Sequence, residues 1–508
     1  MEKFISSTRI AKNTCYLYFR MLFKILVTLY TSRVILDVIG IQDFGIYNVV
    51  AGVVALLGFV NSSMAISVQR YLSFEIGRGG SLKQLNTIFS MAVVIHLLIA
   101  LIVVAGTEIL GKYLFEYLLN IPPDRYDSAY ILFHFTILTC GLSIIQVPYM
   151  ALLISHERMN AYAYIGILEM VLRLVAVYAL LGVSYDKLPC YGFFLLLIGI
   201  IVSFLYYYCA KKQISQIRVT LTWNKKIFKD LLNFASWSAL GEFAWAGTGQ
   251  GVNILLNVFF SPVVNAARAV AQQVISGIMQ FVINFQTAIN PQIVKSYAAG
   301  ETRKMMILTN KGILYSYYLL LMMSFPILIN IDFVLRIWLK NVPLYSNVFC
   351  TLAIIGAMID SLSNLLATVA KAYGKIRNYQ LAVSLILFLN LPFSYIALKF
   401  GAPAYAVYWV YLGVSFFLLI ARLLLLKRMV AYDIKSFVLN VLLKILVVTA
   451  IAIPLPIIVK HLLPDSWSTF VYSTLLSLLC ISSVVFTVGI GTKEKNLIKH
   501  KILFILRR

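Results

Sequence analysis

The chain has 508 residues, of which 61% are hydrophobic and only 12% are charged, and its formal net charge is +24. Soluble globular proteins contain about 45–50% apolar and roughly 25% charged residues, so this chain would expose large apolar patches to water. The composition excludes a soluble globular protein and a disordered chain, and it predicts a polytopic membrane protein.

A membrane-spanning helix needs about 20 consecutive, mostly apolar residues. By that criterion the sequence predicts an all-α protein with about fourteen spans. They cover residues 14–36, 44–68, 86–110, 128–154, 160–182, 188–210, 231–259, 264–290, 307–330, 346–370, 379–399, 403–426, 437–459 and 467–490. The first, seventh and eighth spans are the least apolar, and polar groups at membrane depth face a bundle interior or a wet cavity.

The distribution of Lys and Arg predicts the orientation. With the N-terminus in the cytoplasm, the cytoplasmic segments hold about four times as many basic residues as the alternate loops. Both termini are therefore expected in the cytoplasm, and the basic charge needs no nucleic acid to explain it. No loop is long enough to fold as a soluble domain, and no Walker A pattern is present, so an ATP motor on this chain is not expected.

A weak internal repeat suggests two halves. VILDVIG at 34–40 resembles ILLNVFF at 254–260, and each ends a span before a short outer turn. Parallel six-helix repeats are a plan that transporters use. The predicted domains are an N-terminal six-helix lobe (1–210), a basic cytoplasmic linker (211–230), a C-terminal six-helix lobe (231–428), and two extra spans with a basic tail (429–508).

The first span carries two cations on one helical face. Arg20 and Lys24 are spaced i, i+4, and Thr28 and Thr31 continue the polar face outward. One interpretation is a cationic cavity wall that holds an anionic head group. The alternative is a pair of cytoplasmic anchors that snorkel to the membrane surface.

The seventh span combines polar side chains with clustered glycines. Glu242 and Asn253 share a helical face, Asn257 lies close to it, and Gln250 stands within the GTGQG stretch. A polar cavity lining with a hinge is one interpretation, and a close helix–helix contact through small residues is the other. The two interpretations are compatible.

The eighth span opens with another polar face. Asn265, Arg268 and Gln272 stand at positions 0, +3 and +7, which share one side of a helix. Arg268 is the best single candidate for an anion contact on this span.

Acids inside spans are candidates for ion coupling. Glu169 and Arg173 are spaced i, i+4 and form either a neutralising pair or a switchable acid. Asp360 has no cation in its own span, so it is either a coupling carboxylate, as Glu242 could also be, or a hydrogen-bonded structural residue. No metal-ligand spacing and no catalytic constellation is present, so no enzyme, metal or cofactor is expected beyond a coupling cation such as H⁺ or Na⁺.

Two stretches carry a family resemblance. They are YTSRVILDVIGIQDFGIYNVVAGVVALLGFVNSSMAISVQRYLSFEIGRG and GQGVNILLNVFFSPVVNAARAVAQQVISGIMQFVINFQTAINPQIVKSYAAGE. Both resemble Wzx-type oligosaccharide flippases of the multidrug/oligosaccharidyl-lipid/polysaccharide exporter superfamily. The resemblance covers about a fifth of the chain.

The resemblance implies two six-helix lobes around a central cavity and alternating access. It implies a substrate of undecaprenyl-diphosphate-linked oligosaccharide, moved from the cytoplasmic to the periplasmic leaflet of the bacterial inner membrane for O-antigen, capsule or exopolysaccharide synthesis. Related lipid II flippases use cavity arginines in spans one and eight for the pyrophosphate. Arg20, Lys24 and Arg268 lie on those spans here, so the resemblance implies that they bind the diphosphate, although a Lys at position 24 departs from strict bidentate phosphate binding. The amides of spans seven and eight would then suit sugar hydroxyls. Expected partners are membrane lipids, a polysaccharide polymerase and a chain-length regulator.

Two alternatives stay open. A multidrug–cation antiporter of the same superfamily would favour an acidic cavity, whereas the mid-span charges here are mostly basic. A membrane polysaccharide polymerase is the enzyme alternative, but such proteins carry a large periplasmic loop, and none is expected here.

Overall fold

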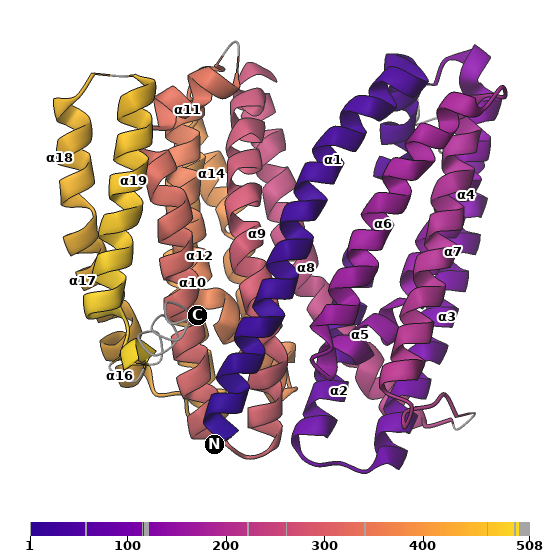
Figure 1. The fold of residues 1–508 in the computed structure, drawn as a ribbon, viewed down its shortest axis with the longest axis horizontal. Helices are drawn as coiled ribbons and strands as arrows, with labels where there is room; N and C mark the ends of the chain where they lie inside the picture. Colours follow the sequence, from indigo (N-terminus) through magenta and orange to yellow (C-terminus); the bar gives the residue numbers. More distant parts are fainter. Residues whose placement is uncertain are drawn as a thin grey trace, which may run out of the picture. The chain divides into compact units, whose positions relative to one another are not determined.

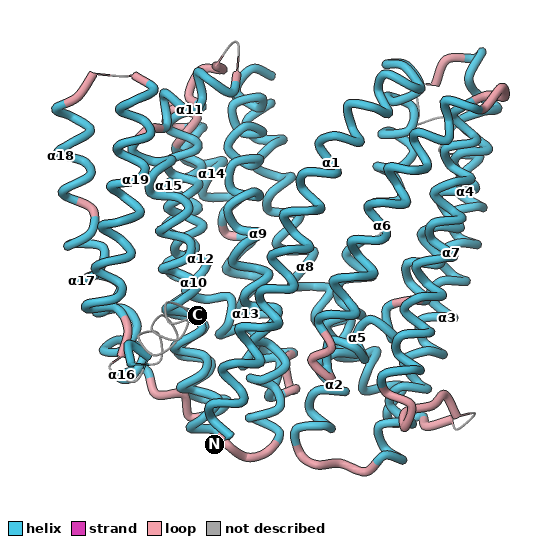
Figure 2. The backbone as a smooth tube through the Cα atoms, viewed as in Figure 1, coloured by secondary structure: helices cyan, strands magenta, loops and turns pink. Residues whose placement is uncertain are grey.

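The computed structural model describes most of the chain. It covers residues 2–55, 58–113, 115, 121–220, 223–260, 262–339, 342–464, 466–491 and 494–496. Within these ranges all regular secondary structure is helical, and no strand occurs (Figure 2). The predicted all-α polytopic fold class is confirmed.

The first half of the chain forms eight α-helices and two 3₁₀ turns. They are α1 (Glu2–Ala55), α2 (Gly58–Gly77), α3 (Leu82–Tyr113), η2 (Pro123–Arg125), α4 (Tyr126–Ile145), α5 (Val147–Ser155), α6 (Met159–Ala179), η3 (Leu180–Gly182), α7 (Lys187–Gln213) and α8 (Lys225–Phe259) (Figure 1).

The second half is also helical throughout its described part. Its elements are α9 (Pro262–Ala298), α10 (Thr302–Ile329), α11 (Ile331–Trp338), α12 (Ser346–Tyr373), α13 (Arg377–Phe388), α14 (Asn390–Lys399), α15 (Ala406–Val430), α16 (Ile434–Phe437), η4 (Val438–Leu442), α17 (Leu443–Ala452), α18 (Pro454–Leu462), α19 (Trp467–Val484) and η5 (Val485–Gly489).

Ten described helical segments are long and apolar enough to cross a membrane. They match ten of the fourteen predicted spans. The other four predicted spans fall on α1, α2, α8 and α9, which are helical but more polar. The first, seventh and eighth predicted spans, which are the least apolar in the sequence, are therefore among the four that do not meet the length and hydropathy criterion for a membrane span.

Bends in the helices occur at glycine and proline. α1 runs through two predicted spans, and Gly40, with φ 82° and ψ 168°, separates its two helical parts. A positive φ of this kind suits glycine, which has no Cβ to clash. The α4–α5 junction precedes Pro148, and the α17–α18 junction precedes Pro454. Proline lacks a backbone N–H and cannot continue the helical hydrogen-bond ladder there.

The chain divides into two compact units. The first contains Met1–Phe243, Thr287–Glu301 and Gly374–Arg377, and the second contains Ala244–Gln286, Thr302–Tyr373 and Asn378–Arg508. α8 and α9 each contribute residues to both units. The lobe and linker boundaries expected from the sequence stay a prediction.

Each unit has its own apolar core. In the first, α1 packs on α6, α2 on α5, and α4 on α7, around buried residues such as Leu72, Leu153 and Val202. In the second, α12 packs on α10 and α15 around residues such as Leu256 and Phe349. The two C-terminal spans pack on each other, and α19 contacts α10 (Figure 1).

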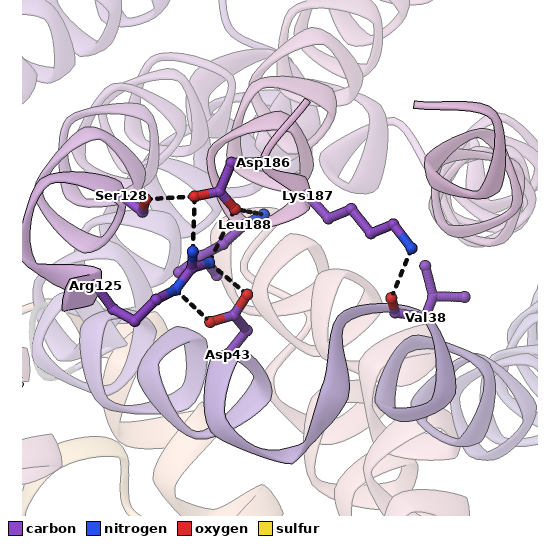
Figure 3. Close-up of polar contacts among 7 residues, drawn as sticks. All are labelled: Val38, Asp43, Arg125, Ser128, Asp186, Lys187 and Leu188. Atoms are coloured by element: carbon purple, nitrogen blue, oxygen red, sulfur yellow. Dashed lines mark hydrogen bonds and ion pairs between the residues drawn. The ribbon is translucent and has the colours of Figure 1, made fainter. Parts of the chain in front are cut away.

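Charged residues from three connections meet at one end of the first unit (Figure 3). Arg125 donates to Asp43 through Nε at 2.9 Å and Nη2 at 2.5 Å. It also donates to Asp186 through Nη1 at 2.9 Å and Nη2 at 2.8 Å. Asp186 in addition caps α7 by accepting from the Leu188 N–H at 3.1 Å. The sequence-based topology expects all three charged residues near the outer side, and that assignment stays a prediction.

Candidate functional site

The second unit holds a polar cluster around Arg268. Arg268 lies on α9, and its Nη1 donates to the Asn253 Oδ1 on α8. Asn253 in turn donates through Nδ2 to the Gln250 Oε1 at 3.0 Å, because residues three apart on a helix are neighbours. The structure thus brings together three residues that the sequence selected separately.

The charge of Arg268 is surrounded by neutral partners. It lies beside Tyr408 and Tyr411 of α15, and it forms no ion pair with any carboxylate in the described ranges. Its Nε is buried and has no hydrogen-bond partner there. A guanidinium with a spare donor and no counter-ion is suited to an anionic ligand, which can accept two parallel hydrogen bonds.

A half-buried acid, Asp360, lies next to this cluster. Tyr411 donates its hydroxyl hydrogen bond to the Asp360 Oδ2 on α12. Arg422, on the same helix as Tyr411, donates through Nη1 to the carbonyl and the Oγ of Ser363, each at 2.9 Å. The polar groups therefore continue from α8 and α9 to α12 and α15, and the ion-coupling role expected for Asp360 stays a prediction.

Arg20 in the first unit has a comparable neutral setting. Its guanidinium lies 4.1 Å from the centroid of the Tyr162 ring, a cation–π geometry. Gly166, one turn farther along α6, leaves room for it, because a Cβ there would collide with the Arg20 side chain. The Tyr206 ring lies 6.4 Å from that of Tyr162. Arg20 has no ion pair with a described carboxylate, although Glu169 contributes to its electrostatic surroundings.

The rest of the polar face of the first span is more open. Lys24 and Thr28 are exposed, and Thr31 is half-buried. Arg20 and Lys24 therefore share a helical face, as predicted, but only Arg20 is packed against a neighbouring helix.

Glu169 and Arg173 form the ion pair that their spacing predicts. The Arg173 Nη2 lies 2.8 Å from the Glu169 Oε1, and its Nε donates to the same oxygen at 3.1 Å. The pair lies on one helix and neutralises itself. This geometry accounts for both charges without a ligand, and a role in ion coupling stays a prediction.

The remaining predicted residues lie apart from these contacts. Glu242 is half-buried in the part of α8 that belongs to the first unit. Gln272 is exposed on α9. The side chains of Asn257 and Asn265 lie outside the described residues, although both positions are helical. No group of three His, Cys, Asp or Glu that could hold a metal ion occurs in the described part.

Tyrosines are the residues that sequence reasoning missed. Tyr162, Tyr408 and Tyr411 lie against Arg20, Arg268 and Asp360, and none of the three tyrosines is among the candidate residues selected from the sequence. A usable signal was present on α15, where Tyr411 and Arg422 lie near one helical face with a serine between them.

Comparisons with known proteins identify the fold. No family model and no curated protein sequence matches the chain. A solved multidrug resistance MATE family transporter of the MOP superfamily, in an outward-facing conformation, has a TM-score of 0.74 at 12% identity over 84% of this chain and 97% of its own.

Two further solved structures are similar. A MOP superfamily transporter from Pyrococcus furiosus, described as having a binding pocket of reverse polarity, has a TM-score of 0.73 at 11% identity, covering 85% of this chain and 96% of its own. The Vibrio cholerae MATE transporter VcmN, in its bent form, has a TM-score of 0.68 at 16% identity, covering 86% and 99%. The chain therefore has the fold of MATE and MOP superfamily transporters.

Proposed function

We propose that this chain is a membrane transporter of an anionic, amphiphilic solute, namely an undecaprenyl-diphosphate-linked oligosaccharide. It would move the repeat unit from the cytoplasmic to the periplasmic leaflet of the bacterial inner membrane by alternating access, with both termini in the cytoplasm. The observation that carries the proposal is the Arg268 cluster, a cation with a spare buried donor and only neutral partners among the described residues. The fold is similar to that of a solved MATE family transporter.

The proposed roles follow from the chemistry of each group. Arg268 and Arg20 hold the diphosphate, with Lys24 as an exposed third cation. Asn253 and Gln250 offer amide groups to sugar hydroxyls. A lipid diphosphate cannot cross hydrocarbon unaided, and charge-assisted bonds from Arg compensate for the water that its phosphates lose. The proposal assigns no catalytic residue to the chain.

The driving force is proposed to come from substrate flux or from a cation gradient. Asp360 is the proposed coupling group because its carboxylate is enclosed by the Tyr411 hydroxyl and lies near the Arg268 cluster. Glu169 is a weaker candidate because Arg173 already neutralises it.

Multidrug export by cation antiport is the second candidate, and the solved structures favour it. One of the similar structures is named a multidrug resistance MATE family transporter, and another is named a MATE transporter. The similar Pyrococcus furiosus transporter is described as having a binding pocket of reverse polarity, and that polarity is said to suggest a different function for that protein. The absence of a counter-ion for Arg20 and Arg268 among described residues is the reason we place an anionic substrate first.

The test is a gene deletion complemented with wild type, Arg268→Ala or Asp360→Asn at equal protein abundance. A flippase predicts that deletion abolishes surface glycan, that lipid-linked repeat units accumulate inaccessible to periplasmic enzymes, and that Arg268→Ala does not complement. Unchanged glycan together with lost tolerance to cationic drugs would instead establish the antiporter. Single repeat units on the surface without long chains would indicate a polymerase.

A further inference from the structure

Glu157 is a buried acid held by two residues far away in the sequence. It lies in the turn between α5 and α6, and its side chain is only 4% exposed. Lys295 on α9 contacts its Oε1 at 2.5 Å, and Gln292 donates to its Oε2 at 2.6 Å. Both carboxylate oxygens therefore have partners on one turn of α9. All three residues belong to the first unit.

The backbone at Glu157 is in an unusual conformation. Its φ is 61°, in the left-handed region that favours glycine or asparagine. A non-glycine residue there is strained, and strain of this kind persists where the surrounding structure requires it. A charged side chain in a strained turn is a poor choice for stability alone, because a buried ion pair seldom improves on apolar packing. The position is therefore better explained by what the carboxylate holds.

The contact between the α5–α6 turn and α9 extends to α2. Gly77 lies against the backbone of Lys295 so closely that a Cβ at residue 77 would collide with its Cα and carbonyl oxygen. The rings of Phe74 and Tyr297 lie 6.4 Å apart in the same region. Any larger residue at position 77 would wedge α2 away from α9.

These contacts join connections that the predicted topology puts on the cytoplasmic side. Gly77 and Glu157 come from the first predicted lobe, whereas Gln292 and Lys295 come from the second. In the proposed alternating-access cycle, the cytoplasmic connections of the two predicted lobes must separate when substrate enters from that side. A contact that joins such connections would have to break at that step.

α9 links this contact to the proposed binding residue. Arg268 and Lys295 lie 27 residues apart in the sequence of the same helix. Pro291 lies between them, close to the point where α9 passes from one unit to the other after Gln286. Proline removes a backbone hydrogen bond and permits a bend. α9 can therefore bend at Pro291 when one of its ends moves.

We propose that Glu157, Lys295 and Gln292, with Gly77, form a cytoplasmic latch that closes the transporter on that side and must open to admit substrate. This inference rests on the proposed function only in that the chain is a transporter, and it does not depend on the substrate. Opening separates the Glu157 carboxylate from Lys295 and exposes both to water.

The test is hydrogen–deuterium exchange of the full chain in lipid nanodiscs, with no substrate added. Three variants weaken the latch in different ways: Glu157→Gln, Lys295→Gln and Gly77→Ala. We expect amides in 153–159 and 288–300 to exchange at least about tenfold faster in all three variants, with unchanged exchange in 188–210.

Arg158→Gln and Gly106→Ala are matched controls, because Arg158 is an exposed neighbouring cation and a Cβ at Gly106 meets nothing. Both controls are expected to exchange like wild type.

The charge-reversed pair separates a latch from simple misfolding. Glu157→Lys combined with Lys295→Glu should restore protection in both segments, since Lys tolerates the turn no worse than Glu. Wild-type protection in the three weakening variants, or faster exchange over the whole chain including 188–210, would overturn the latch. Complementation by Arg268→Ala would overturn the proposed substrate site and leave the exchange result unaffected.

Discussion

Arg173 on α6 and Arg268 on α9 both lie in predicted membrane spans, and their surroundings differ in charge. Arg173 is paired with Glu169 one turn away on α6, so the helix carries no net charge there. Arg268 reaches to another helix and finds the neutral amide of Asn253, and its Nε stays without a partner among the described residues. A cation that must be buried is normally neutralised nearby. We therefore expect Arg173 to stabilise the structure, and we propose Arg268 as the ligand contact.

The largest expected effect is the loss of Arg268. Arg268→Ala should weaken substrate binding about 10- to 100-fold, because hydrogen bonds to charged groups contribute about 1.5–3 kcal/mol and 1.4 kcal/mol is tenfold. Binding of the lipid-linked oligosaccharide to purified protein measures this. Arg268→Lys keeps the charge without the planar fork and should be intermediate. Equal binding by all three proteins would remove Arg268 from the site.

Breaking the Glu169–Arg173 pair should affect stability instead. Glu169→Gln leaves Arg173 without a counter-ion, which costs about 3–5 kcal/mol in a fully buried pair. Because both side chains here are about a third exposed, we expect about 1–2 kcal/mol, measured as a lower Tm. The double variant with Arg173→Gln should recover most of it. If Glu169→Gln keeps its Tm but loses the ion dependence of transport, Glu169 is a coupling residue and the contrast fails.

The amide that holds Arg268 should have a smaller effect. Asn253→Ala removes a side-chain acceptor, worth about 1 kcal/mol, so substrate affinity should fall about fivefold. Gly106→Ala is the control, because a Cβ at Gly106 meets nothing. It should stay within about twofold of wild type. An effect of Asn253→Ala no larger than that of this control would show that the amide does not support Arg268.

The smallest expected effect is on acid stability, at the outer cluster of Figure 3. Burial raises the pKa of Asp186, but hydrogen bonds from Arg125, Ser128 and the Leu188 N–H outweigh it and hold the pKa below its usual value. The resulting stability is present above the unfolded pKa of about 3.9 and is lost as the pH falls through the lower folded pKa. Asp186→Asn should therefore flatten the decline of Tm below about pH 4. An unchanged decline would show that Asp186 does not contribute.

The sequence by itself determined the fold class and most of the helices. Apolar run length is a local property, so ten spans could be located without tertiary information, and the four polar spans also proved helical. The sequence also identified Arg20, Arg268 and Asp360 as charges inside the membrane-spanning part, because such charges are costly wherever they lie.

Only the tertiary structure decided which side chains pack against each of these charges and which of the charges form an ion pair or a hydrogen bond. The Glu169–Arg173 pair could be predicted because it lies within one helix, whereas Tyr162 and Tyr411 approach Arg20 and Asp360 from other helices. Helical periodicity specifies which face a side chain shares but not which helix packs on that face. The contact of Glu157 with Lys295, 138 residues away, was invisible for the same reason.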